Sequence, residues 1–138
     1  MKEQLDDETR TAMVDYRLER ARQTLGEADL LRTGDYFNAT VNRLYYACYY
    51  AASALLLNRH IEANTHNGVK TQLSMHFVRT GLLDLEHSTT FGLLNAIVAT
   101  MVTLPIVATM VTLPIVTLLW WMCFVRVRKH SLMLWSNW

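Results

Sequence analysis

The stretch that decides the fold is DYFNATVNRLYYACYYAASALLLN, which runs from Asp35 to Asn58. Its apolar residues recur every three or four positions, a spacing that places them along one side of an α-helix. Asp35 stands where a capping residue is expected to begin such a helix. The stretch therefore predicts one long helix, rich in alanine and tyrosine, whose buried seam is Val41, Leu44, Tyr45, Cys48, Ala52, Leu55 and Leu56.

A loop and another helix are expected after this stretch. Residues Arg59 to Asn67 show no helical periodicity and are assigned to a loop. Either Thr65 or Asn67 is expected to cap the next helix, because short polar side chains accept hydrogen bonds from the free N–H groups of a first turn. Gly81 is expected to end this helix, and its apolar spacing comes from Val69, Leu73 and Phe77.

Two further helices complete the helical region. Apolar positions alternate with charges from about Glu8 to Arg32, and Gly34 suits the C′ position at which such a helix ends. Another helix is expected to begin between Asp84 and Ser88 and to carry Phe91 and Leu94. Because helices joined by short loops pack antiparallel, residues 8–95 predict an all-α, up-and-down bundle.

The distribution of charge divides the 138 residues into two parts. The overall net charge is +1, which gives no general attraction to nucleic acid or to an anionic membrane. Residues 1–95 hold ten basic and twelve acidic residues, a net charge of −2, whereas residues 96–138 hold three basic residues, no acidic residue and all four tryptophans. We therefore expect a helical bundle over residues 8–95 and an atypical apolar tail over residues 96–138.

Several kinds of enzyme site have no motif in this sequence. It has no glycine-rich phosphate loop and no Gly-x-Ser-x-Gly, and its histidines lack metal-ligand spacing. We expect neither a metal nor a cofactor. Cys48 and Cys123 lie one in each part, which favours two reduced thiols and a reducing compartment. The acidic start MKEQLDDETR differs from a secretory signal, so a cytoplasmic protein is expected.

Three short motifs stand in the helical region: Arg-x-Tyr-Tyr-Ala at Arg43–Ala47, Ala-Leu-Leu at Ala54–Leu56 and Thr-His-x-Gly at Thr65–Gly68. Together they resemble the HEPN domain family, small helical proteins of bacteria and archaea, over roughly Tyr16 to Asn95. The resemblance implies a four- or five-helix bundle that forms a homodimer. It also implies a toxin–antitoxin pair with a minimal nucleotidyltransferase protein, and many such proteins are metal-independent ribonucleases.

The resemblance places the arginine of the ribonuclease pattern at Arg43 and puts Tyr50 where related ribonucleases carry histidine. Seven residues make two helical turns, so both side chains lie on one face, which can present two groups to one phosphodiester. We expect Arg43 to contact RNA or phosphate, with Asn42 and Tyr46 beside it. A phenol, whose ordinary pKa is about 10, is a poor general base. His66, just beyond this helix, is the substitute candidate.

Two functions remain open for these residues. The first is a module without catalysis that dimerises and binds a nucleotidyltransferase or RNA through Arg43. The second is a ribonuclease that uses Arg43 with Tyr50 or His66. Purely structural roles are also open, because the arginine can pair with an acidic neighbour. Thr65 and His66 can cap a helix, and the tyrosines can belong to the core.

The tail contains the nine residues IVATMVTLP twice in succession, over residues 97–114. Its lack of charge suits a membrane segment over residues 96–125, but Pro105 and Pro114 interrupt a helix there. We favour a reading-frame slip near Asn95, because regrouping the codons permits a polar segment with Tyr, Gly and Asp followed by a helix-like pattern. A soluble ordered tail is the third interpretation. A membrane becomes a partner only if the tail is genuine.

Overall fold

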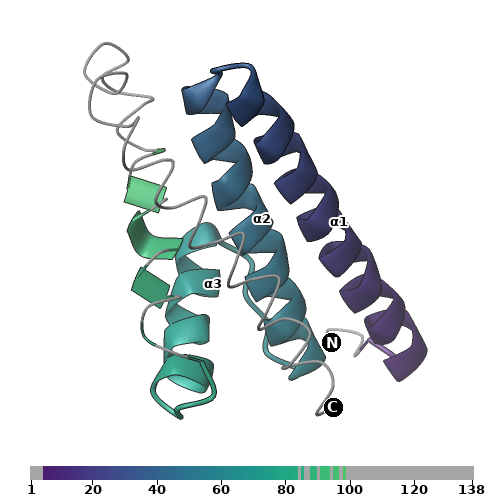
Figure 1. Cartoon of the computed structure of the whole chain (residues 1–138). Helices are drawn as coiled ribbons and strands as arrows, with labels where there is room; N and C mark the ends of the chain where they lie inside the picture. Colours follow the sequence, from purple (N-terminus) through teal and green to yellow (C-terminus); the bar gives the residue numbers. More distant parts are fainter. Residues whose placement is uncertain are drawn as a thin grey trace.

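The computed structural model describes residues 5–83, 85, 88, 89, 91–93, 95, 96 and 98. Its elements are the helices α1 (Asp7–Thr33), α2 (Phe37–Asn58) and α3 (His66–Leu73) and the π-helix η1 (Ser74–Val78), which continues α3. In Figure 1, α1 and α2 run antiparallel, and α3 lies on the side of α2 away from α1. The described residues contain no strand, and the predicted all-α fold is confirmed.

Helix α1 begins with a side-chain cap and packs through small residues. The Asp6 carboxylate accepts hydrogen bonds from the backbone N–H and the hydroxyl of Thr9, each at 2.8 Å. The hydrogen bond from the Thr9 backbone is the main cause that lowers the pKa of Asp6 below its ordinary value of 3.8. The residues that α1 buries are Val14, Ala21, Thr24 and Ala28. Three of the four are small, which lets a neighbouring helix approach closely.

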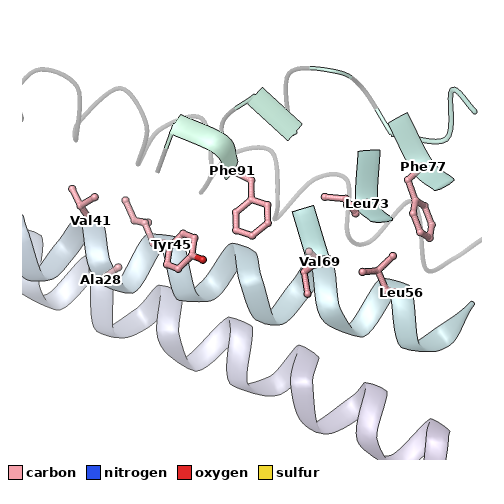
Figure 2. Close-up of a cluster of buried hydrophobic side chains, with 10 residues drawn as sticks. Ala28, Val41, Tyr45, Leu56, Val69, Leu73, Phe77 and Phe91 are labelled. Carbon is pink, nitrogen blue, oxygen red and sulfur yellow. The ribbon is translucent and has the colours of Figure 1, made fainter. Parts of the chain in front are cut away.

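The core lies between α2, α3 and the segment after η1. In Figure 2, side chains of α2 face Val69 and Leu73 of α3, and two phenylalanines complete the cluster. The buried members are Ala28, Val41, Leu44, Tyr45, Ala52, Leu56, Val69, Leu73, Phe77 and Phe91. The predicted seam of α2 is confirmed, although Cys48 and Leu55 are only partly buried against the core.

The turn between α1 and α2 differs from the prediction. Asp35 adopts a left-handed conformation (φ 62°) and does not cap α2; Tyr36 takes that position and makes no side-chain capping bond. The N–H groups of Asp35 and Tyr36 close the end of α1 on the carbonyls of Arg32 and Leu31, at 3.1 and 3.0 Å. Gly34 has a φ of −91°, so it is not the left-handed residue. A Cβ there would lie 2.9 Å from the Tyr36 ring.

The start of α3 follows one of the two predicted caps. The hydroxyl of Thr65 accepts a hydrogen bond from the Gly68 N–H at 2.9 Å, which confirms Thr65 as the capping residue. A Cβ at Gly68 would lie 2.9 Å from that hydroxyl. Glycine therefore avoids a steric clash with the capping side chain. The helix begins at His66, so the predicted loop to Asn67 extended two residues too far. Gly81 is left-handed (φ 76°) after η1, as expected of a helix end.

The last described residues are helical and reach the core. Residues 85, 88, 89, 91–93, 95, 96 and 98 have helical conformation, and Phe91 among them is 3% exposed. In the part of the chain that the structure describes, no helix has the length and apolar character that crossing a membrane requires. Leu94, the repeated stretch apart from Val98, Cys123 and nearly all of the proposed membrane segment lie outside the described residues.

Candidate functional site

Tyrosines of α2 hold His66 against the bundle. The hydroxyl of Tyr45 lies 2.6 Å from Nδ1 of His66. The ring of Tyr49 stacks on the imidazole with 4.4 Å between ring centroids and 28° between planes. His66 is itself exposed and is the first residue of α3. The loop between α2 and α3 therefore folds back and returns this histidine to the face of α2 that carries the tyrosines.

Tyr46 is the centre of the arrangement. The guanidinium carbon of Arg43 lies 5.9 Å from the centroid of the Tyr46 ring, and the centroids of His66 and Tyr50 lie 6.2 and 6.3 Å from it. Arg43, Tyr46, Tyr49 and Tyr50 are partly exposed and His66 is exposed. These five residues form what we call the Arg43–His66 surface. It combines one cation, one imidazole and three phenol rings.

The Tyr45 hydrogen bond determines how the imidazole of His66 is oriented. Burial raises the pKa of Tyr45 above its ordinary value of 10.0, with smaller contributions from Tyr46 and Tyr49. The hydroxyl is therefore protonated at neutral pH, and as the better donor of the pair we assign it to donate to Nδ1. The proton of the neutral imidazole then resides on Nε2. The surface thus presents an N–H donor at this position.

Arg43 also pairs with α1. Its Nη1 lies 3.3 Å from Oε2 of Glu27, and Nη1 of Arg20 lies 3.8 Å from Oε1 of the same carboxylate. The Arg20 guanidinium also lies 5.7 Å from the ring centroid of Tyr50. The pairing of Arg43 with an acidic neighbour, one of the alternatives, is present. The Arg43 side chain is nevertheless 39% exposed, so its charge is not enclosed.

The remaining predicted site residues lie at the edge of this surface. Tyr50 shares a face of α2 with Arg43, but Ala47 between them is buried at 3% exposure. Asn42 is half-buried next to Arg43 in the sequence of α2. Sequence reasoning missed two residues of α1, Glu27, which contacts Arg43, and Arg20, which contacts Tyr50. The available signal was their spacing, because they stand seven residues apart and so share one face of α1.

The described residues contain no group of three or more side chains placed to hold a metal ion. Arginine, histidine and tyrosine together can instead bind an anion. An arginine fork receives phosphate oxygens, an imidazole N–H donates to a further oxygen, and phenol rings stack on bases. The Arg43–His66 surface places groups of these three kinds beside one another.

Comparison with known proteins agrees with this architecture. The family model described as HEPN domain matches residues 14–99, more than half of the chain. The chain belongs to the HEPN family. The predicted resemblance, which was placed on motifs between Arg43 and Gly68, is confirmed.

Relatives of this HEPN chain occur in bacteria and archaea. A UPF0332 protein of Thermotoga maritima is 38% identical over 54% of the chain and 56% of the relative. A protein of Methanocaldococcus jannaschii, named "Putative toxin", is 32% identical over 50% of the chain and 47% of the relative. The chain thus spans about half the length of the curated relatives it matches. No solved structure matches it.

Proposed function

We propose that this HEPN chain is the toxin-like member of a toxin–antitoxin pair and binds single-stranded RNA at the Arg43–His66 surface. The observation that carries the proposal is that Arg43 and His66 both lie beside the ring of Tyr46, at 5.9 and 6.2 Å from its centroid. The name of the M. jannaschii relative supports the toxin-like role. A cation and an imidazole donor on one surface support the binding of RNA.

Arg43 would supply the contact with the phosphate backbone. Its guanidinium is partly exposed and carries a fixed positive charge. Contacts of this kind provide most of the affinity of proteins for single-stranded nucleic acid, and they weaken as salt increases. RNA binding at this surface should therefore depend on ionic strength.

The tyrosines would supply contacts with bases. The ring of Tyr50 lies between two other tyrosines: its centroid is 6.3 Å from that of Tyr46 and 6.0 Å from that of Tyr49. All three are partly exposed, and a base stacked on an aromatic ring contributes about 1–3 kcal/mol. Stacking of this kind is tolerant of sequence, so the proposal is for binding without strong preference for a base.

Substitution of the arginine tests the proposal. Arg43→Ala should weaken the binding of a short fluorescent single-stranded RNA about three- to tenfold, measured by anisotropy, because a phosphate contact is lost. The slope of log affinity against log salt should decrease in magnitude by about 0.7, the value for one phosphate contact with a single strand.

Arg22→Ala is the matched control. Arg22 lies on α1, is 66% exposed and pairs with Glu19 at 3.5 Å, so this substitution removes the same charge away from the surface. It should leave the affinity within about twofold of the wild type, as expected of a general electrostatic effect. Equal losses for Arg43→Ala and Arg22→Ala would refute RNA binding at the Arg43–His66 surface.

A metal-independent ribonuclease is the second candidate function, because the fold brings His66 to the surface that holds Arg43. As a general base, His66 would need Nε2 without a proton, whereas the tautomer that we assign from the contact with Tyr45 carries the proton there. Binding without cleavage is therefore the first choice. Cleavage of single-stranded RNA in EDTA, reduced about 100-fold or more by His66→Ala, would reverse this order.

The proposal also includes a homodimer and a minimal nucleotidyltransferase partner, both of which the HEPN resemblance implies. Sedimentation of the purified chain should give twice the mass of one chain. Co-expression with the protein encoded beside it should yield a stable complex on size exclusion. A monomer at micromolar concentration that forms no such complex would remove this part of the proposal and leave the RNA contact to be tested separately.

A further inference from the structure

Glu27 contacts two guanidinium groups at once. Its two oxygens lie 3.3 Å from Arg43 Nη1 and 3.8 Å from Arg20 Nη1. Charge-assisted hydrogen bonds between such groups are usually shorter, about 2.7–2.9 Å, so both contacts are loose. The side chains of Arg20, Glu27 and Arg43 are 33%, 42% and 39% exposed. Solvent therefore reaches the carboxylate and both cations, and the Glu27 carboxylate can exchange with a dissolved anion.

The antiparallel pairing of α1 and α2 produces this arrangement. Arg20 and Glu27 are two turns apart on α1, and Arg43 and Tyr50 are two turns apart on α2, so each pair shares one face. Because the helices run in opposite directions, Glu27 meets Arg43 while Arg20 meets Tyr50. The two arginines thus belong to different helices and contact the two oxygens of one carboxylate.

The carboxylate occupies a position that suits a phosphodiester. A phosphodiester, like a carboxylate, presents two equivalent oxygens that share one negative charge, and arginine forks bind both groups. The two arginines and Glu27 together carry a charge of +1. Exchange of Glu27 for a phosphate costs little, because an ion pair exposed to this degree contributes only weakly.

We propose that Arg20 and Arg43 form a two-arginine clamp for a phosphodiester and that Glu27 is the counterion which the phosphodiester displaces. The proposal rests on RNA binding at the Arg43–His66 surface and adds Arg20 and Glu27 to it. It gives the Glu27 carboxylate a role beside an arginine that is proposed to bind phosphate. While no RNA is bound, Glu27 contacts both guanidinium groups, and Arg20 also donates a hydrogen bond to Gln23 at 3.3 Å.

Substitutions in the full-length protein test the clamp with two probes, a short fluorescent single-stranded RNA and inorganic pyrophosphate. Glu27→Gln should bind the RNA about two- to fivefold more tightly, because the competing carboxylate is gone. Pyrophosphate should raise the melting temperature of Glu27→Gln more than that of the wild type. Arg20→Ala should weaken RNA binding about threefold or more, and Arg20→Lys should fall between, because lysine lacks the fork.

Glu19→Gln is the matched control for the charge change. Glu19 lies on the same helix, is 58% exposed and pairs with Arg22. It should change RNA affinity less than twofold, since it competes with no phosphate at this surface. A purely structural role of Glu27 predicts the opposite sign from the clamp, namely a less stable protein with unchanged or weaker RNA binding.

The outcomes separate the clamp from the proposed function. RNA binding that depends on Arg43 but is indifferent to Arg20→Ala and Glu27→Gln overturns the clamp and leaves the proposed function standing. If neither the wild type nor Glu27→Gln binds RNA, the proposed function fails, and pyrophosphate decides the clamp. Greater stabilisation of Glu27→Gln than of the wild type and Glu19→Gln supports the clamp, and equal or absent stabilisation overturns it.

Discussion

Tyr45 joins the buried core to the Arg43–His66 surface. Its side chain is 5% exposed, and its ring stacks on Phe91 with 5.5 Å between centroids. Its hydroxyl reaches Nδ1 of His66 at the edge of this core. A single hydroxyl on a buried ring therefore fixes the direction of an exposed imidazole.

Removal of this hydroxyl should cost stability. We expect Tyr45→Phe to lower the free energy of unfolding by about 0.5–1.5 kcal/mol at neutral pH, the usual contribution of one hydrogen bond, as measured by urea unfolding. Tyr16→Phe is the control, because Tyr16 is 67% exposed and its change should stay within about 0.5 kcal/mol. Equal changes in the two variants would show that the hydrogen bond contributes nothing.

The same residue should make the protein sensitive to alkaline pH. Burial raises the pKa of Tyr45 above 10.0, so the folded state holds this proton more tightly than the unfolded chain. The resulting stability is complete below the unfolded pKa of about 10 and is lost as pH rises through the folded pKa. Between about pH 9 and pH 11, the wild type should lose stability more steeply than Tyr45→Phe. Parallel curves would contradict this origin.

At the scale of elements, small residues set how closely α1 and α2 pack. Ala28 of α1 is fully buried, and Ala47 and Ala54 of α2 are 3% and 0% exposed. Close packing allows Arg43 and Glu27 at the edge of the interface to reach each other across the two helices. The candidate site thus depends on alanines whose side chains have no functional group.

A larger side chain in this interface should separate the helices. We expect Ala28→Leu to destabilise the protein by about 1–3 kcal/mol, because a filled interface has no room for three more carbons, as measured by thermal or urea unfolding. Ala12→Leu on the same helix is the control: Ala12 is exposed, so its change should lie within about 0.5 kcal/mol. If Ala28→Leu left the free energy of unfolding unchanged, the interface would be loosely packed.

Helix α3 has only eight residues, and helices this short are marginal without help from capping or packing. Thr65 supplies the capping bond immediately before His66. We expect Thr65→Ala to destabilise the protein by about 1 kcal/mol and to weaken RNA binding, because His66 begins the same turn. Thr71→Ala, at an exposed position of the same helix, should do neither. Unchanged unfolding of Thr65→Ala would rule out the importance of this cap.

At the scale of the whole molecule, the family match stops near the change of composition. The match ends at residue 99, and the apolar tail without acidic residues begins after Asn95. The chain also spans only about half of the relatives it matches. These facts suit the hypothesis of a reading-frame slip near Asn95, which stays a proposal beside a membrane segment and an ordered soluble tail.

The nucleotide sequence decides among these interpretations. When the bases after Asn95 are regrouped by one position, we expect an open frame that encodes a polar, tyrosine-bearing segment and then an amphipathic helix. The protein made from that frame should unfold at a higher temperature than the present chain, because an amphipathic last helix would bury further apolar surface against the bundle. Stop codons throughout the regrouped frame would exclude the slip.

Sequence patterns were sufficient where interactions are local. The seam of α2 from Val41 to Leu56 and the helix end at Gly81 follow from neighbours within a few residues, and the two predicted capping residues, Thr65 and Asn67, included the one that caps α3. The turn at Asp35 was mispredicted because two local effects compete at this residue. Its carboxylate suits a cap, but the backbone bonds that close α1 require a left-handed residue at that position.

The sequence by itself determined that this chain is all-helical, that it belongs with HEPN proteins and that Arg43 is the arginine to examine, whereas the π-helix η1 after α3 was not predicted. Only the tertiary structure decided that Glu27 and Arg20 converge on that arginine and that His66 returns to Tyr45. The physical reason is that helical periodicity follows from the order of apolar and polar residues along the chain. The register between antiparallel helices and the path of a loop instead depend on how buried faces pack in three dimensions.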